Sequence, residues 1–504
     1  MSCVQAITRP LAGVGDVPSR SDGSLGASWD LLRRSRAVNG SVPVFYPAFE
    51  PSPFTFGRAG DGRGISGRSQ PNKGPAPGSS GSESKQMESK LGSDSYDSGS
   101  SSEQQGRPWI GLLVLFTAAA FVETGFYAQI NAFTPLFLPQ LGISPSQVAV
   151  WTGAVVSITS AVGLPLLPFW GALADRYARQ PIIVRSFVAH FIAGVGMILS
   201  GSIWVFLLAR SVTSLALGNS GLMLTTLSER APAHRQGLAF TIMNSAPPVA
   251  AFIAPLIGGP IFDRYGFRVL LMINVAVMAL VILGMTFGYR DVFKGTDRGP
   301  LLKMALDSVR IVALSGRLRT LFPALFFLFA GWLLGLTYVP LAVTSLYQGA
   351  NPGVAVGLVL GSGGLTSLIG SPLIGILADR VGHWRVLKLA GLVSVVLWPL
   401  PALAWNLWSL AAAWAVLAGV ISAVFAISFS VLSSSAATSV RGRVMAFAFL
   451  PVNVGLLVGP AIGALVTRAS ILAIFPTGAV LTLIGVGILV VAERQPVTEF
   501  DPAS

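Results

Sequence analysis

The sequence predicts an all-α polytopic membrane protein made of two pseudo-symmetric six-helix halves, with about twelve transmembrane helices. Of its 504 residues, 52% are apolar and only 11% are charged, against roughly 25% charged in an ordinary soluble domain. From Trp109 onward the chain is a series of apolar runs, each about 20 residues long, the length that crosses a hydrocarbon core of about 30 Å. The longest hydrophilic gap after Trp109 runs from Arg290 to Arg319 and leaves six runs on either side.

Residues 1–108 are expected to form a disordered N-terminal tail. The segment from Gly57 to Ser102 is rich in Gly, Ser and Pro, so it buries too little apolar surface to offset the loss of chain entropy. The tail has no apolar core followed by a small-residue cleavage site, which argues against a secretory signal peptide. An organelle transit peptide and a translation start at Met87 both stay open as alternatives.

The two halves are predicted to cover residues 109–289 and 320–492. Residues 290–319 form the linker between them, and its Lys303–Arg319 part has the alternation of apolar and basic residues typical of a helix on the inner membrane surface. Residues 493–504 form a short cytoplasmic tail. The predicted crossings are 109–138, 147–172, 182–201, 204–227, 238–262, 268–289, 320–345, 354–377, 386–404, 407–432, 443–467 and 470–491.

The basic residues predict the orientation of this map. Of the 22 Lys and Arg residues after residue 108, 18 fall in loops and ends on the same side as the tail, while Arg264, Arg268 and Arg468 fall on the other side. Because cytoplasmic loops carry the excess of Lys and Arg, both termini are expected in the cytoplasm, with the plasma (inner) membrane as the location. The net charge of +13 is then a topology signal, and nucleic-acid binding loses its main support.

The sequence lacks the residues that several classes of functional site need. One cysteine and three scattered histidines exclude a disulfide framework and predict no metal site. The sequence has no Gly-rich ATP-binding loop and no carboxylate or His cluster suited to a membrane hydrolase, so we expect neither an enzyme nor a cofactor.

Two motifs recur in the two halves. The second crossing ends in GALADRYARQP (Gly171–Pro181), and the eighth ends in GILADRVGHWR (Gly375–Arg385), 204 residues later. At a similar offset, AFIAPLIGGP (Ala251–Pro260) corresponds to LLVGPAIGAL (Leu456–Leu465). Two repeats in register indicate that the halves are structural copies, as in alternating-access transporters.

The first of these motifs resembles the loop between the second and third helices of the major facilitator superfamily, and the resemblance extends from Trp109 to Ala492. The superfamily motif runs Gly-x-x-x-Asp-Arg-x-Gly-Arg-Arg; Ala178 and Gln180 depart from it here. The resemblance implies a cytoplasmic gate, in which Asp175 faces the eleventh helix near Arg443 and Asp379 faces the fifth near Leu238, although ordinary capping and topology charges are the alternative. The gate residues are Gly171, Asp175, Arg176 and Arg179 in the first half, and Gly375, Asp379, Arg380, Gly382 and Arg385 in the second.

The second motif resembles the Gly-Pro-x-x-Gly-Gly sequence of the drug/proton antiporter branch, with Ala254 in place of the first glycine. Proline lacks the N–H of a straight helix, so the fifth and eleventh helices are expected to bend. Gly455 extends a small-xxx-small ridge that permits close helix packing. The kink residues are Pro255, Gly258 and Gly259 in the fifth helix, and Gly459, Pro460 and Gly463 in the eleventh.

Glu123 is the only acid deep in a predicted crossing. A lone carboxylate at this depth is costly, so such acids usually face a polar cavity and mark a substrate or proton path. Tyr127 and Asn131 follow at spacings of four and share its helical face. Burial favours the protonated carboxyl and a nearby cation favours the ionised one, which suits the exchange of a proton for a substrate. A structural hydrogen bond to another helix is the alternative.

Arg210 and the polar or aromatic residues of other crossings complete the candidate site. Arg210, in the pattern Arg-x7-Gly that ends at Gly218, resembles the membrane arginine motif of the same antiporters and is expected to pair with Glu123 for proton coupling; snorkelling to the outer interface is the alternative. Helix packing is the alternative for the cavity-lining residues. These are Tyr127, Asn131, Asn244, Trp332, Tyr338 and Asn453.

The sequence therefore predicts a secondary active transporter that works by alternating access. Its expected activity is proton-coupled efflux of small amphipathic, drug-like or cationic compounds, with the substrate, protons and the lipid bilayer as partners and the monomer as the working unit. A symporter or facilitator of a small metabolite such as a sugar is one alternative. A non-transporting membrane receptor or scaffold on the same fold is another.

Overall fold

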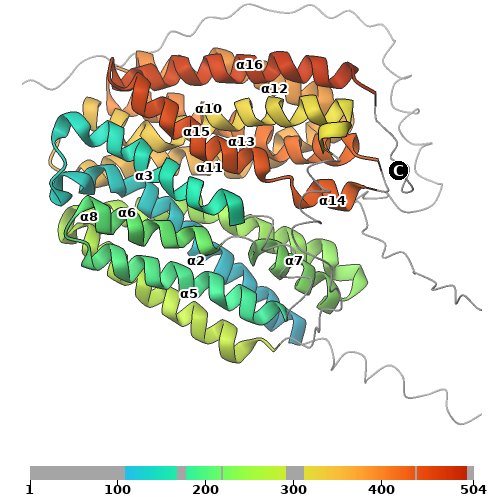
Figure 1. Cartoon of the computed structure of the whole chain (residues 1–504), viewed down its shortest axis with the longest axis horizontal. Coiled ribbons are helices and arrows are strands. Elements are labelled where there is room, and N and C mark those ends of the chain that lie inside the picture. Colours follow the sequence, from blue (N-terminus) through green and yellow to red (C-terminus); the bar gives the residue numbers. More distant parts are fainter. Residues whose placement is uncertain (1–107, 167–177, 217–218, 291–311, 438–439, 497–504) are drawn as a thin grey trace, which may run out of the picture. The chain divides into compact units, whose positions relative to one another are not determined.

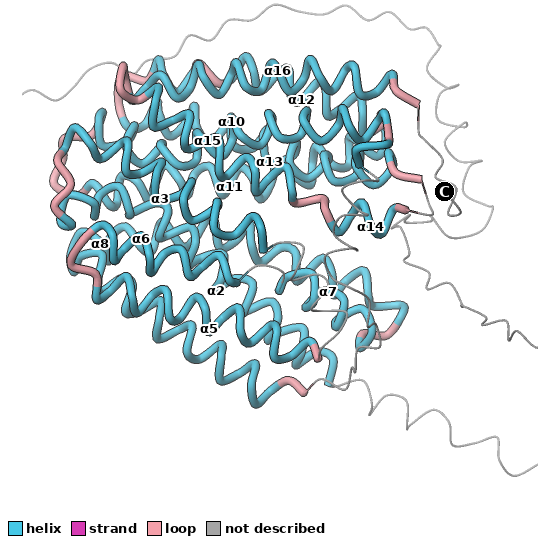
Figure 2. Tube along the Cα trace, viewed as in Figure 1, coloured by secondary structure: helices cyan, strands magenta, loops and turns pink. Residues whose placement is uncertain are grey.

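The computed structural model describes residues 108–166, 178–216, 219–290, 312–437 and 440–496. The predicted N-terminal tail, most of the linker and the gate residues Gly171, Asp175 and Arg176 lie outside these ranges, as does Gly218. The proposed boundaries of tail and linker therefore stay predictions. Within the described ranges the chain forms helices and no strands (Figure 2).

The described part of the first half contains six α-helices. The predicted fourth crossing contains α6, the short helix η4 (Val212–Ala216) and α7, in chain order. The fifth and sixth crossings both lie in α8, whose helical backbone breaks at Gly266 with φ of +82°. Short turns of helix at η1 (Leu138–Leu141), η2 (Pro145–Gln147), η3 (Leu164–Leu166) and η5 (Ala233–Arg235) flank the long elements. The α-helices are α2 (Pro108–Phe137), α3 (Val148–Gly163), α5 (Arg179–Leu199), α6 (Ile203–Ser211), α7 (Asn219–Arg230) and α8 (Gln236–Gly288).

The second half, over its described residues, contains seven α-helices. The predicted eleventh crossing is divided into a short α14 and α15, and the short helices η6 (Leu400–Leu403) and η7 (Ile471–Ala473) precede α13 and α16. The α-helices are α10 (Gly316–Leu346), α11 (Pro352–Val381), α12 (His383–Leu397), α13 (Leu407–Ser435), α14 (Arg441–Ala446), α15 (Leu450–Val466) and α16 (Ile474–Arg494).

Eleven helical segments of the described residues are long and apolar enough to cross a membrane. The twelfth, α15, has 17 residues and rises about 25 Å at 1.5 Å per residue, a little less than the hydrocarbon thickness. The all-α, multi-crossing fold class is thus confirmed, with one crossing shorter than the sequence predicts.

Polar side chains begin several of these helices. Ser202 accepts a hydrogen bond from the N–H of Val205 at the start of α6, and Asn406 forms a capping box with Ser409 at the start of α13. Such caps satisfy N–H groups that have no partner within the helix.

Both ends of the helical region lie at the same end of the two bundles (Figure 1): α2 begins there at Pro108 and α16 finishes there at Arg494. We call this the terminal end and its opposite the far end. Which side of the membrane each end faces stays a prediction.

The halves meet mainly through two helix pairs, α8 with α11 and α3 with α15. A Cβ on Gly259 of α8 would lie 2.5 Å from the carbonyl oxygen of Gly353, so the backbones there are in direct contact. Asp263 adds a polar link, because its carboxylate accepts hydrogen bonds of 2.8 Å from the N–H groups of both Gly353 and Val354 at the start of α11. These contacts lie towards the far end.

At the terminal end, the ion pairs of the described residues stay within one half. Arg179 pairs with Glu229 in the first half, and Lys388 pairs with Glu493 in the second. Neither of these ion pairs crosses between the halves, whereas Asp263 links them near the far end.

Candidate functional site

The interior of the first half contains a polar cluster on one face of α2. Glu123, Tyr127 and Asn131 follow one another at spacings of four and contact residues of α5, α6, η4 and α7. This common face agrees with the face predicted from the sequence.

Glu123 is held by an amide. Its Oε2 accepts a hydrogen bond of 2.8 Å from Nδ2 of Asn219, a buried residue at the start of α7. No ion pair within 4.0 Å joins Glu123 to Arg210, both of which lie in the described ranges. The predicted Glu123–Arg210 pair is therefore wrong for this structure.

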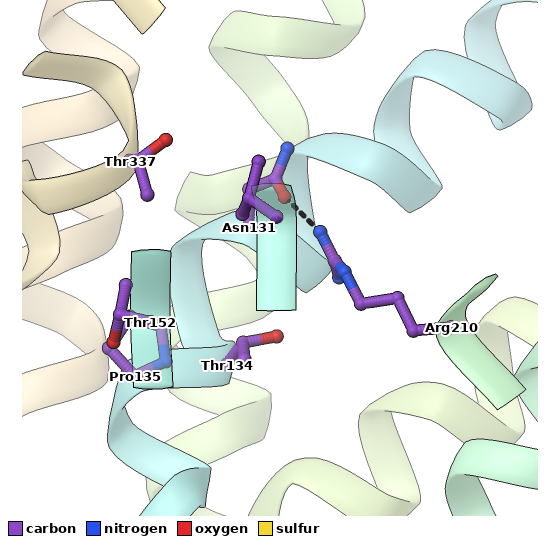
Figure 3. Close-up of a pocket in the computed structure, with 7 residues that line it drawn as sticks. Asn131, Thr134, Pro135, Thr152, Arg210 and Thr337 are labelled. Atoms are coloured by element: carbon purple, nitrogen blue, oxygen red, sulfur yellow. Dashed lines mark hydrogen bonds between the residues drawn. The ribbon is translucent and has the colours of Figure 1, made fainter. Parts of the chain in front are cut away.

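Arg210 is buried, with 5% of its surface exposed. From α6 its guanidinium extends towards α2 and donates to Oδ1 of Asn131 (Figure 3). The Nε of Arg210 is buried and has no hydrogen-bond partner among the residues that the structure describes. The alternative expectation, a side chain that snorkels to the outer interface, is also wrong, because the side chain points into the protein.

Tyr127 lies in the turn between Glu123 and Asn131. Its hydroxyl donates to the carbonyl oxygen of Thr213 at 3.3 Å, and its ring packs edge-on against His190 with the centroids 5.0 Å apart. His190 is fully buried in α5, and its Nδ1 lies 2.9 Å from the carbonyl oxygen of Ser186. His190 could not be recognised from the sequence, because a single histidine in an apolar run has no spacing signal.

A small pocket lies beside this cluster, between the two halves. Most of its lining comes from α2, α3 and α6 of the first half, and Thr337 comes from α10 of the second (Figure 3). Its three threonines were also missed, because an isolated Thr is common in helices; each donates its hydroxyl to a carbonyl four residues earlier in its own helix. The lining residues are Asn131, Thr134, Pro135, Thr152, Val156, Arg210 and Thr337.

The remaining cavity candidates lie elsewhere. Tyr338 is fully buried and donates to the carbonyl oxygen of Pro460 at 3.0 Å, so in this structure it packs between α10 and α15, which agrees with helix packing, the alternative expectation. Trp332 stacks on Trp414 with the rings 9° from parallel. Asn453 donates to the carbonyl oxygen of Phe449 in its own chain segment, and Asn244 is exposed on α8.

Gln129 is a buried residue that the sequence analysis missed. Its Nε2 donates to the carbonyl oxygen of Ala254 at 2.8 Å, and its Oε1 accepts from Nδ2 of Asn274 at 2.6 Å. A Cβ on Gly258 would lie 3.1 Å from this Nε2. Gln129 therefore ties α2 to both crossings of α8 at the predicted kink motif.

Comparison with known proteins shows the family. The model of the Major Facilitator Superfamily matches residues 115–397 and 321–504. The chain belongs to the major facilitator superfamily. Members of this superfamily are transporters, so the polar cluster of this multi-pass membrane protein is a candidate transport site.

Relatives and solved structures agree with this assignment. The Multidrug resistance protein MdtG of Salmonella typhi is 27% identical over 372 residues, which cover 72% of this chain and 90% of the relative. The D-xylose-proton symporter has a TM-score of 0.63 at 14% identity over 77% of this chain and 98% of its own. A mutant of the nucleoside transporter NupG has a TM-score of 0.59 at 15% identity over 76% of this chain and 98% of its own. These two structures show the shared fold.

The loop motif of the superfamily is only partly described. Arg179 is buried and its two terminal nitrogens donate to the two carboxylate oxygens of Glu229 at 2.7 and 2.8 Å. In the second half, Asp379 is 72% exposed and lies 3.2 Å from His383, which is in α12. The expected contact between Asp379 and the start of α8 is therefore not formed.

Other residues of the second-half motif shape the loop. Gly382 has φ of +107° after the last residue of α11, a conformation that favours glycine. Arg380 and Arg385 are exposed, and the space beside Gly375 is open.

The antiporter-like kink motif of this superfamily member lies in close helix contacts. A Cβ on Gly459 would lie 2.5 Å from the carbonyl oxygen of Ala330, and one on Gly463 would lie 2.1 Å from Cε2 of Tyr338. Pro255 and Pro460 lie inside helices that continue past them. The backbone break within α8 is at Gly266, and bends at the two prolines stay a prediction.

Proposed function

We propose that this superfamily member exports small amphipathic, drug-like compounds in exchange for protons, by alternating access. The observation that supports this is Glu123, a carboxylate inside the first half whose hydrogen-bond partner is the neutral amide of Asn219. An amide can donate to an ionised carboxylate through its nitrogen or accept from a protonated carboxyl through its oxygen. Glu123 can thus load and release a proton without losing its partner.

An arginine in the same place would act differently. A guanidinium has only donors, so it would stabilise the ionised form of Glu123 and oppose protonation. The separation of Arg210 from Glu123 therefore favours proton exchange at the carboxyl.

Two further observations support the proposed substrate class and the proposed direction of transport. The MdtG relative is a multidrug resistance protein and aligns over 90% of its own length. The basic residues indicate that the terminal end faces the cytoplasm. Halves joined at the far end would then leave the site to be reached from the cytoplasm, as export requires.

The test is transport by Glu123→Gln in reconstituted vesicles across a series of imposed pH gradients. We expect the wild-type chain to export a compound faster when the proton gradient is steeper. Glutamine resembles a permanently protonated carboxyl, so the variant is expected to lose this dependence. Flux through Glu123→Gln that still follows the gradient would contradict the assignment.

Glu493→Gln is a matched control. Glu493 pairs with Lys388 at the terminal end of the second half, far from the polar cluster along the chain. The same loss of one carboxylate there should leave the dependence on the proton gradient in place.

The alternatives give different results in the same vesicles. A symporter would accumulate its substrate on the side to which protons flow, and a facilitator would ignore the pH gradient. A receptor or scaffold would bind a compound without moving it.

A further inference from the structure

We propose that the pocket at Arg210 binds the carboxylate group of an anionic amphipathic substrate. This inference rests on the proposed function, because it names the substrate class for the same site.

The first support is that Arg210 is a buried cation that pairs with no acidic residue of the described ranges. The described ranges contain five acidic residues, and each has a partner other than Arg210. Asn219 binds Glu123, Arg179 binds Glu229, the start of α11 binds Asp263, His383 binds Asp379 and Lys388 binds Glu493.

The second support is the set of donors that Arg210 has left. Asn131 accepts one hydrogen bond but supplies no charge, and the buried Nε has no partner among the described residues. Burying an unpaired guanidinium is expensive, and an anion that binds it with hydrogen bonds offsets that cost. A carboxylate matches the planar fork of arginine donors.

The third support is the place of the pocket between the halves. Arg210 and Thr152 come from the first half and Thr337 comes from the second. The neighbouring residues Gly153 and Tyr338 belong to the contact with α15, where a Cβ on Gly153 would lie 2.4 Å from the carbonyl oxygen of Pro460. Movement of the halves would therefore open the pocket to the far side.

The pocket is nearly closed in this structure. The space inside it is about 10 Å³, roughly the room that one water molecule needs, whereas pockets for whole drug-sized ligands have roughly 300–1,000 Å³. A substrate would therefore enter when the halves separate, with its carboxylate at Arg210 and its apolar body between the halves. Cationic compounds, which the sequence analysis left open, are disfavoured because Arg210 repels them.

Exchange of an anion for a proton would move net charge across the membrane. If one monoanion leaves for each proton that enters, both movements carry positive charge inward. A membrane potential that is negative inside would then drive export in addition to the pH gradient.

The test uses three probes with the same apolar body: 2-naphthoate, 2-naphthamide and 2-naphthylmethylammonium. Their binding to the purified full chain in detergent is measured by calorimetry, with protein-free micelles subtracted. We expect the wild-type chain to bind naphthoate at least about tenfold more tightly than naphthamide, and the ammonium most weakly. Arg210→Gln should remove the preference for naphthoate, whereas Arg210→Lys should keep part of it.

Asn131→Asp is a second, nearly isosteric variant that does not remove Arg210. The new carboxylate would pair with Arg210 and should abolish the preference for naphthoate. Asn406→Asp makes the same chemical change at the start of α13, where Asp is also a good N-cap, and should leave the preference unchanged.

The proposal is overturned if the wild-type chain binds none of the probes, binds the amide or ammonium as tightly as naphthoate, or keeps its preference in both Arg210→Gln and Asn131→Asp. These failures differ from failure of the proposed function. Proton-coupled flux of compounds without any anion preference would contradict only the carboxylate site. Selective naphthoate binding without proton-coupled flux would contradict only the proposed transport.

Discussion

Glu123 and Arg210 lie in the same half, yet each is held by an asparagine. The sequence identified Glu123, because an acid deep in an apolar run is rare and costly. It mispredicted the pairing because α6 begins at Ile203 and brings Arg210 level with Asn131, which is eight residues from Glu123 and about 12 Å further along α2. The depth of a residue in a predicted crossing does not determine which neighbouring side chain a long side chain contacts.

Gln129→Leu tests the buried amide that the sequence analysis missed. Leucine would remove the hydrogen bonds of Gln129 to Asn274 and to the backbone oxygen of Ala254, each worth about 0.5–1.5 kcal/mol. We expect a lower thermal midpoint for the purified protein. Gln348→Leu, at an exposed position near the end of α10, is the matched control and should change the midpoint little. Equal midpoints for both variants would contradict the role of Gln129.

The helices themselves could largely be predicted, because length and hydropathy determine a membrane crossing. The eleventh was predicted less well. Its apolar run includes a turn between α14 and α15 that hydropathy does not detect, since residues 447–449 are as apolar as the helix that follows. The glycine ridge of α15 was recognisable from its spacing, whereas its partner helix, α10, became evident only from the structure.

Gly459→Ala tests the contact between α10 and α15. The new Cβ would lie 2.5 Å from the backbone oxygen of Ala330, so the helices must separate. We expect a loss of about 1–3 kcal/mol, typical of overpacking, measured as a lower thermal midpoint. Gly487→Ala in α16 adds the same methyl where no described atom lies within 4 Å, and it should leave stability unchanged or slightly higher. Equal destabilisation by the two changes would count against a packing role specific to Gly459.

At the scale of the whole molecule, the two halves are joined towards the far end by packed glycines and by Asp263. The internal repeat predicted two similar halves, and the family resemblance placed the second crossing opposite the eleventh and the eighth opposite the fifth, which are the pairs that α3 forms with α15 and α11 forms with α8. It did not predict the link at Asp263 near the far end. Asp263 gave no signal in the sequence, because an acid next to Arg264 in a loop has the pattern of an ordinary surface charge. Its partners are backbone N–H groups of the other half, which no residue pattern reveals.

Asp263→Asn tests whether this carboxylate holds the far end closed. The change removes a charge that stabilises the start of α11 and weakens two hydrogen bonds between the halves. With Cys3 replaced by serine, spin labels at Ser146 and Trp405 report the far-end distance by pulsed electron resonance. We expect a larger population of long distances. Asp379→Asn at the terminal end should not produce it, and an unchanged distribution in Asp263→Asn would refute the role.

Proton movement during export shows whether Glu123 couples the compound to protons. Vesicles are loaded with a compound that the wild-type chain exports and with a pH-sensitive dye, and vesicles whose chains have the terminal end facing the lumen are selected. We expect exit of the compound down its gradient to acidify the lumen, and we expect no such acidification in vesicles with Glu123→Gln or without protein. Exit of the compound without a pH change, or with alkalinisation of the lumen, would contradict proton-coupled export through Glu123.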